Sequence, residues 1–193
     1  MIKKKGTYAG FPIGFLVLVI LIMFIIYRYS NMQQNEAQIK TLPPSEYEQL
    51  TAMDLKVRYP DGPQTLIDLN NRFIQYLYGG EINEDEINGI IEKQRGLFAP
   101  ELLDLNEVTQ SVRIAAAQIS QMAASGKKIM EIRSDLPVYA ESEKTGDYES
   151  CTITVTQYWT NNVQDILEYT LVNSGGKWMI FRFDRVGSKS GGD

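Results

Sequence analysis

The chain has 193 residues, the usual length of a single domain. Hydrophobic residues make up 44% and charged residues 22%, which is typical of a folded protein and excludes a disordered or collagen-like chain. With no histidine and one cysteine, the sequence excludes a histidine-based catalytic triad, a histidine-ligated metal, an internal disulfide and a cysteine zinc cluster.

An apolar segment near the N-terminus predicts a membrane anchor. Residues 11–27 contain no charged side chain and are rich in Ile, Leu, Val and Phe; as a helix they span about 25 Å. A cleaved signal peptide is disfavoured because no small-residue cleavage pattern follows the segment, and a buried core helix because every face is apolar. We expect a transmembrane helix over residues 11–29, in contact with the lipid bilayer through residues 11–27, after an N-terminal segment 1–10.

Basic residues predict the orientation of this helix. Lys3, Lys4 and Lys5 precede it, whereas only Arg28 follows closely, so the N-terminus stays in the cytoplasm and the rest lies outside. Residues 31–193 carry 24 acidic and 15 basic side chains, a net charge of −9, which disfavours nucleic acid as a partner. A single cysteine fits an exterior without disulfides, as in many Gram-positive bacteria. We therefore expect a single-pass protein of the cell membrane with an extracytoplasmic C-terminal domain.

A polar stalk over residues 30–44 is expected to lead into a folded domain over residues 45–186. Ser45 and Glu48 have the spacing of a capping box, which predicts a short helix over residues 45–57.

Three longer helical patterns follow. Pro63 suits the first turn of one helix, which ends at Gly79 and Gly80. Asn83 is the expected N-cap of the next. A third stretch covers residues 101–125. Its apolar positions are Leu102, Leu105, Val108, Val112, Ile119 and Met122.

After Lys127 the hydrophobic period changes to two, which predicts strands. In the second strand Cys151, Ile153 and Val155 share a face, and in the last we expect Met179, Phe181 and Phe183 to do so. Helices followed by an antiparallel meander predict an α+β fold, with about three helices packed on a curved four-stranded sheet. Strands are expected over residues 129–139, 148–159, 164–172 and 178–183, turns over 143–147, 161–162 and 173–176, and a polar tail over 187–193.

Several segments carry a resemblance to known domains. They are the helix over residues 65–78, the segment from Leu97 to Pro100, and the closing hairpin over 173–184 with its Gly-Lys-Trp sequence. In this order they resemble the cystatin-like α+β cone shared by nuclear transport factor, ketosteroid isomerase and many bacterial exported domains. The inner-membrane component of type IV secretion machines is similar only in its architecture.

A narrower resemblance covers residues 46–184. It rests on the segments 68–72, 77–78, 85–87, 92–95 and 101–103. Through these the chain resembles an uncharacterised, membrane-anchored domain-of-unknown-function family of Firmicutes with a nuclear-transport-factor-like cone. This resemblance implies a fold and a location, and no activity.

Two groups of residues are candidates for chemistry. Glu81, Glu84, Asp85 and Glu86 form an acidic cluster, but carboxylates in the first turn of a helix are typical of capping, and no calcium-loop pattern is present. Enzymes of the cone fold often carry an Asp or Tyr inside the cone, and four strand residues are placed to face inward. These are Asp135, Tyr139, Tyr158 and Tyr169. An exposed bend at Asp135 and packing roles for the tyrosines are favoured.

Other residues are expected to pack. Cys151 lies on an apolar strand face, which predicts a buried thiol. Trp159 and Trp178 are expected to fill the core or the mouth of the cone. Four aromatic residues form a contact patch if they are exposed together. These are Tyr76, Tyr78, Tyr158 and Trp159.

The favoured function is a noncatalytic protein-interaction or envelope-assembly module. Its partner is another protein or a second copy of the chain, and no cofactor, metal or catalytic residue is assigned. Two alternatives stay open: binding of a small ligand or cell-wall fragment in the cone lumen, and a lyase or isomerase of the ketosteroid isomerase type. An open lumen lined by polar groups favours the alternatives, whereas a lumen filled by Phe and Leu favours protein contact.

Overall fold

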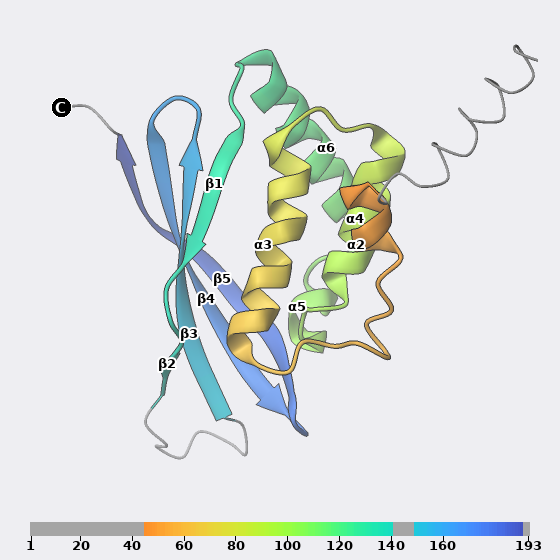
Figure 1. Ribbon diagram of the computed structural model, residues 1–193, viewed down its shortest axis with the longest axis vertical. Coiled ribbons are helices and arrows are strands. Elements are labelled where there is room, and N and C mark those ends of the chain that lie inside the picture. The colour runs from red at the N-terminus through yellow and green to blue at the C-terminus, as the bar shows by residue number, and fades with distance from the viewer. Residues whose placement is uncertain (1–44, 141–148, 191–193) are drawn as a thin grey trace, which may run out of the picture. The chain divides into compact units, whose positions relative to one another are not determined.

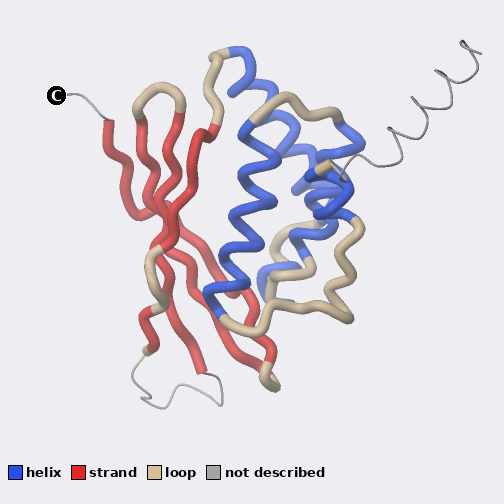
Figure 2. Tube along the Cα trace, in the orientation of Figure 1, coloured by secondary structure: helices blue, strands red, loops and turns tan. Residues whose placement is uncertain are grey.

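The computed structural model describes residues 45–140 and 149–190, which form an α+β domain. Helices lie on one side of an antiparallel sheet, and the other face of the sheet carries no helix among these residues (Figure 1). Figure 2 shows the strands as one layer and the helices as another. The helices are α2 (Glu46–Thr51), α3 (Pro63–Gly79), α4 (Glu84–Arg95), α5 (Pro100–Asp104) and α6 (Val108–Ala124). The strands are β1 (Ile129–Ser134), β2 (Val138–Tyr139), β3 (Glu149–Trp159), β4 (Val163–Ser174) and β5 (Lys177–Ser190).

The predicted capping boxes are confirmed. At the start of α2 the Ser45 hydroxyl accepts a hydrogen bond from the backbone N–H of Glu48, whose carboxylate accepts one from the Ser45 N–H. Asn83 and Glu86 make the same reciprocal pair at the start of α4. Each pair satisfies two backbone donors that a helix end otherwise leaves free. Helix α2 is shorter than expected because the Asp54 carboxylate accepts from the Lys56 N–H and begins a turn.

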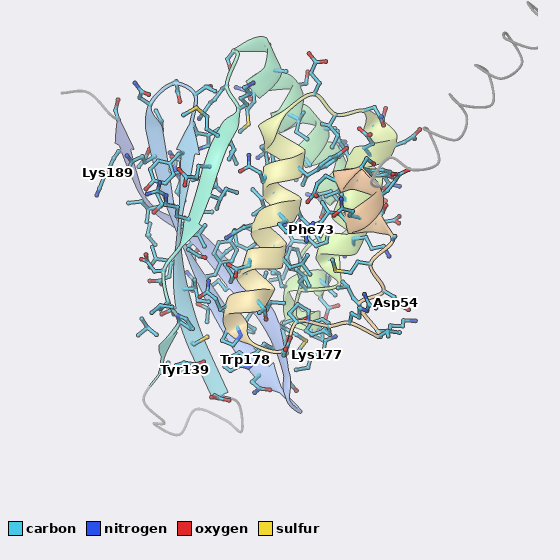
Figure 3. The ribbon with its side chains drawn as sticks, viewed as in Figure 1. Asp54, Phe73, Tyr139, Lys177, Trp178 and Lys189 are labelled. Carbon is cyan, nitrogen blue, oxygen red and sulfur yellow. The ribbon has the colours of Figure 1, made fainter. Side chains whose placement is uncertain are left out.

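The core lies between α3 and the sheet. Helix α3 buries one face completely, and Phe73 lies among the side chains between the helices (Figure 3). On the sheet side, Cys151, Ile153 and Val155 are buried on one face of β3, as the alternation predicts. Among the described residues, the helices that form the core therefore cover one face of the sheet only.

The third predicted helix is wrong in two respects. It is broken into α5 and α6, and Leu105, expected in its apolar stripe, lies in the break and is 82% exposed. Helix α6 buries only Ala115 among its residues. The helix therefore lies over the domain without filling the space beneath it.

The sheet order is β1-β3-β4-β5, with the two-residue β2 also paired to β3. The single first strand expected over residues 129–139 is divided into β1 and β2, because a proline donates no backbone hydrogen bond and Pro137 lies between them. The observed five strands and five helices, counted over the described residues, replace the expected four strands and about three helices.

The closing hairpin turns at Gly175 and Gly176, whose φ angles of 62° and 83° suit a residue without a Cβ. Strand β5 then continues to Ser190, so residues 187–190, expected in a polar tail, pair with β4.

The expected shared face of Met179, Phe181 and Phe183 is wrong. A register shift opposite Thr170 and Leu171 pairs Ile180 with Leu171 and Phe183 with Tyr169. Ile180 and Phe183 therefore both lie on the helix side although they are three positions apart in the chain, which is the effect of a bulge.

The segment between α4 and α5 covers part of the β5 edge. The Ile180 N–H donates to the Leu97 carbonyl at 2.9 Å, and the Ala99 N–H donates to the Ile180 carbonyl at 2.8 Å. This pairing protects an otherwise open strand edge.

No helix among residues 45–140 and 149–190 is long and apolar enough to cross a membrane. The predicted N-terminal segment 1–10, transmembrane helix 11–29 and stalk 30–44 lie outside the described residues, as do the turn at 143–147 and the end of the expected tail at 191–193.

Candidate ligand-binding cavity

A cavity of about 400 Å³ lies between the helices and the sheet. It falls in the range of roughly 300–1,000 Å³ that is typical of small-molecule sites. Side chains of α3, α4, α5 and α6 line one side, and side chains of β3, β4 and β5 line the other. The cavity follows from α6, which buries little of its own surface.

The wall is deep on the sheet and on α3, and open along α6. Its deep part is less than 10% exposed and includes Asn70 from α3 and Gln157, Trp159 and Tyr169 from the sheet. The rim is a row on α6 with a spacing of four residues, which places it along one side of the helix. This row is Gln110, Ile114, Gln118 and Met122.

The lining combines aromatic rings with uncharged polar groups. Five aromatic side chains line the cavity: Tyr78, Phe98, Trp159, Tyr169 and Phe183. Six carboxamides accompany them: Asn70, Gln94, Asn106, Gln110, Gln118 and Gln157. The bulge in β5 contributes to this surface, because it places Phe183 on the helix side, stacked on Tyr169 with 5.6 Å between ring centroids.

Two hydrogen bonds hold polar side chains of the lining. The Gln94 Nε2 donates to the Asn70 Oδ1 at 2.9 Å, which links α4 to α3. The Tyr78 hydroxyl donates to the Gln118 Oε1 at 3.0 Å, which links α3 to α6. These bonds fix the positions of four lining side chains.

One buried donor of the lining, the indole Nε1 of Trp159, lacks an acceptor within the described part of the chain. Trp159 is 4% exposed. Asn70, which is 1% exposed, has its Oδ1 bonded to Gln94 and its amide beside the Tyr169 hydroxyl. Because a buried donor without a partner costs roughly 1–3 kcal/mol, the Trp159 indole is an unfavourable feature of the fold at this wall.

Burial also governs the Tyr169 hydroxyl. Removal from water raises the pKa of Tyr169 to about 12, and the neighbouring Asn70 side chain opposes part of that rise. Tyr169 is therefore a neutral lining group at physiological pH.

The structure separates the four strand residues considered as inward-facing. Tyr169 alone lines the cavity. Asp135 is exposed in the segment between β1 and β2, as expected, and its N–H donates to the Thr154 carbonyl of β3. Tyr139 is 51% exposed beside Trp178. Tyr158 lies under the Arg133 guanidinium, 5.2 Å from its ring centroid.

The suggested aromatic patch does not form as one surface. Tyr78 and Trp159 meet edge to face at 6.5 Å between centroids. Tyr76 instead lies beside Tyr47, and Tyr158 pairs with Arg133. Only the first pair contributes to the cavity.

The acidic cluster serves helix capping. Glu86 caps the start of α4, and it adds to the effect of burial in raising the pKa of Tyr76. Glu84 and Asp85 lie exposed in the first turn of the helix, where carboxylates interact favourably with its dipole. No group of three metal-ligating side chains occurs within the described ranges.

Cys151 and Trp178 are buried, as the strand pattern predicts. Trp178 accepts a hydrogen bond at its carbonyl from the Tyr59 hydroxyl, and Lys177 lies over the Tyr59 ring at 4.1 Å. Figure 3 shows Lys177, Trp178 and Tyr139 together at one end of the sheet. This aromatic group stabilises the hairpin end of the sheet and does not line the cavity.

Sequence reasoning missed the carboxamides. Gln157 follows Cys151, Ile153 and Val155 on the buried face of β3. A polar residue at the next position of this apolar alternation is the signal that could have predicted a buried carboxamide. Asn70 likewise falls on the buried face of α3.

Comparison with known proteins gives the family. A family model described as a domain of unknown function (DUF6715) matches residues 1–183. The chain belongs to this family. The DUF6715 match includes every residue that lines the cavity, and it supports the expected domain-of-unknown-function family. No curated protein and no solved structure matches the chain.

Proposed function

We propose that this DUF6715 protein binds a small ligand in the cavity between its helices and its sheet, without transforming it. The observation that carries the proposal is a cavity of about 400 Å³ whose wall combines five aromatic rings with six carboxamides. A concave, largely apolar wall with a few convergent polar groups is typical of small-molecule sites.

A binding role is favoured over catalysis by the chemistry of the wall. Its titratable side chains are Tyr78 and Tyr169, and burial raises the pKa of both. A general base for proton abstraction needs a pKa near the working pH. Asp135, the carboxylate considered for that role, is exposed outside the cavity.

Protein contact remains the second candidate, and a specific surface favours it. Leu136, Val138 and Tyr139 are 79%, 68% and 51% exposed along β2 and the segment before it. Exposed apolar side chains at a sheet edge are typical of contact surfaces. The cavity favours ligand binding over protein contact. If side chains filled the space between the helices and the sheet, protein contact would be the better explanation.

The location is part of the proposal. Residues 11–27 are uncharged and apolar, and the family match begins at residue 1, so the apolar segment belongs to the family pattern. We infer an anchor that holds the domain outside the cytoplasmic membrane of a Gram-positive cell. The order of helices and strands is compatible with a cone of the nuclear-transport-factor type.

Filling the cavity tests the proposal. Ala115 lines the cavity from α6 and is 4% exposed, so Ala115→Phe introduces a ring into it. Ala117→Phe is the matched control, because Ala117 is exposed on the same helix. A library of neutral fragments is screened against the full chain by saturation-transfer difference NMR. We expect fragments that bind saturably to the wild type and to Ala117→Phe, and that lose binding in Ala115→Phe. Fragments that bind all three proteins equally, or a screen without hits, would contradict the proposal.

A further inference from the structure

We propose that the ligand is an uncharged ring bearing several hydroxyl or carbonyl oxygens, with the chemistry of a neutral N-acetylated sugar. This inference rests on the proposed function and specifies the ligand of the same cavity.

The absence of charge on the wall selects an uncharged ligand. Every lining side chain that the structure describes is neutral at physiological pH. A buried ion needs a counter-charge, because its desolvation is otherwise strongly unfavourable. Lys127 is near, but its ammonium lies over the Trp159 ring at 4.5 Å and lines a separate small depression.

The unpaired indole selects an oxygen acceptor. The Trp159 indole N–H is a donor only and has no acceptor among the described residues. The Asn70 amide is already engaged, with its oxygen bonded to Gln94 and its nitrogen beside the Tyr169 hydroxyl. A ligand that pairs with the indole N–H therefore presents at least one acceptor oxygen.

The remaining carboxamides select a ligand that both donates and accepts. Gln157 lies in the deep part of the wall, whereas Gln110 is exposed on the rim. Each carboxamide offers one acceptor oxygen and two donor hydrogens. Hydroxyl groups and an acetamido group offer the same two functions, whereas a hydrocarbon ring leaves these side chains unpaired.

The aromatic rings disfavour a flat heteroaromatic ligand. Tyr169 and Phe183 stack on each other, and Tyr78 meets Trp159 by its edge. These four rings therefore do not form an open parallel pair that would sandwich a planar base. A puckered ring with apolar C–H faces can instead pack on the Phe183 ring, which is 46% exposed.

A matched set of probes tests the ligand class. The full chain is held in lipid nanodiscs, which contain no sugar headgroups, and binding is measured by saturation-transfer difference NMR. The probes are N-acetylglucosamine and its β-1,4-linked dimer. N-acetylmuramic acid is the anionic comparison, glucosamine the cationic one, and cyclohexanemethanol the apolar ring. We expect saturable binding of the two neutral sugars, and binding of each charged probe that is weaker by about tenfold or more.

Two variants test whether the unpaired Trp159 indole and the Gln157 carboxamide contribute to binding. Trp159→Phe removes the indole donor, and Gln157→Leu removes a deep carboxamide; each should weaken binding of the neutral sugars by about tenfold. Gln121→Leu is the matched control, because Gln121 is exposed on α6 away from the cavity lining. Circular dichroism establishes whether each variant is folded. If Trp159→Phe does not fold, Gln157→Leu still tests the inference.

The outcomes separate this inference from the proposed function. If cyclohexanemethanol binds as tightly as the sugars, or a charged probe binds more tightly, the sugar chemistry is wrong while the cavity remains a binding site. If no sugar binds but neutral fragments still compete for the cavity blocked by Ala115→Phe, the inference alone fails. If neither sugars nor fragments bind, both fail.

Discussion

The side chain of Gln94 donates to the Asn70 Oδ1 at 2.9 Å and so leaves the Asn70 amide nitrogen to lie beside the Tyr169 hydroxyl. Asn70 is 1% exposed, so both contacts are shielded from water. The pair joins α3 to α4 at the wall of the cavity. It therefore fixes two polar side chains of that wall.

Removing both members of this pair should cost less stability than removing Asn70 alone. In Asn70→Leu alone the Gln94 amide loses its acceptor, and we expect the free energy of unfolding to fall by about 1 kcal/mol or more. In the double variant Asn70→Leu/Gln94→Leu the Gln94 amide is no longer left unpaired, so stability should be higher than in Asn70→Leu. Urea denaturation measures both. A double variant less stable than Asn70→Leu would show that the pair serves the fold and not a ligand.

Much of the helical layer follows from local sequence, because caps and helix ends depend on neighbouring residues. Ser45, Asn83 and Pro63 each begin a helix where their chemistry indicates. The alternation in β3 likewise predicts its buried face. Predicting these features requires only the period of the hydrophobic pattern and a few hydrogen bonds between side chains and nearby backbone groups.

The cavity could not be predicted in the same way. It depends on a bulge that turns Phe183 toward the helices, and on α6 burying only Ala115. Both arise from contacts between segments distant in the sequence. A period-two pattern assigns residues to faces only while the register is regular, so one extra residue reverses the assignment for the remainder of the strand.

Two arginines on β5 should differ in how much they contribute to the free energy of unfolding. Arg185 pairs with Asp165, which is 8% exposed and also accepts from the Ser188 hydroxyl at 2.9 Å. Arg185→Ala leaves this buried carboxylate without its cation, and we expect the free energy of unfolding to fall by about 1–2 kcal/mol. Arg182 forms an exposed pair with Asp184, so Arg182→Ala should change stability little. Chemical denaturation of the two variants side by side makes the comparison. Equal effects would mean that burial of Asp165 does not strengthen its ion pair.

Cys151 should resist modification in the folded protein. It is 1% exposed, and burial together with the Glu149 carboxylate raises the pKa of its thiol to about 11. Since the thiolate is the reactive form, reaction with a disulfide reagent at pH 8 should proceed only as the protein unfolds. The release of the coloured thiolate is followed in buffer and in urea, with Cys151→Ala as the blank. Rapid labelling in buffer would contradict the buried position.

Alkaline pH should weaken the fold through Tyr169. Burial raises the pKa of this phenol in the folded state to about 12, above the value of about 10 for an unfolded chain. Below pH 10 both states keep the proton and the stabilisation is fully present. Between about pH 10 and pH 12 the unfolded state loses the proton first, so the free energy of unfolding falls as the pH rises, by up to about 1.4 kcal/mol per pH unit.

The comparison of Tyr169→Phe with the wild type isolates this effect. The variant has no phenol to titrate at this position of the cavity wall, so its stability should decline less steeply between about pH 10 and pH 12, as measured by urea denaturation at each pH. Tyr158→Phe, on the opposite face of the sheet, is the matched control and should follow the wild type. Identical slopes for all three proteins would place the Tyr169 hydroxyl in contact with water.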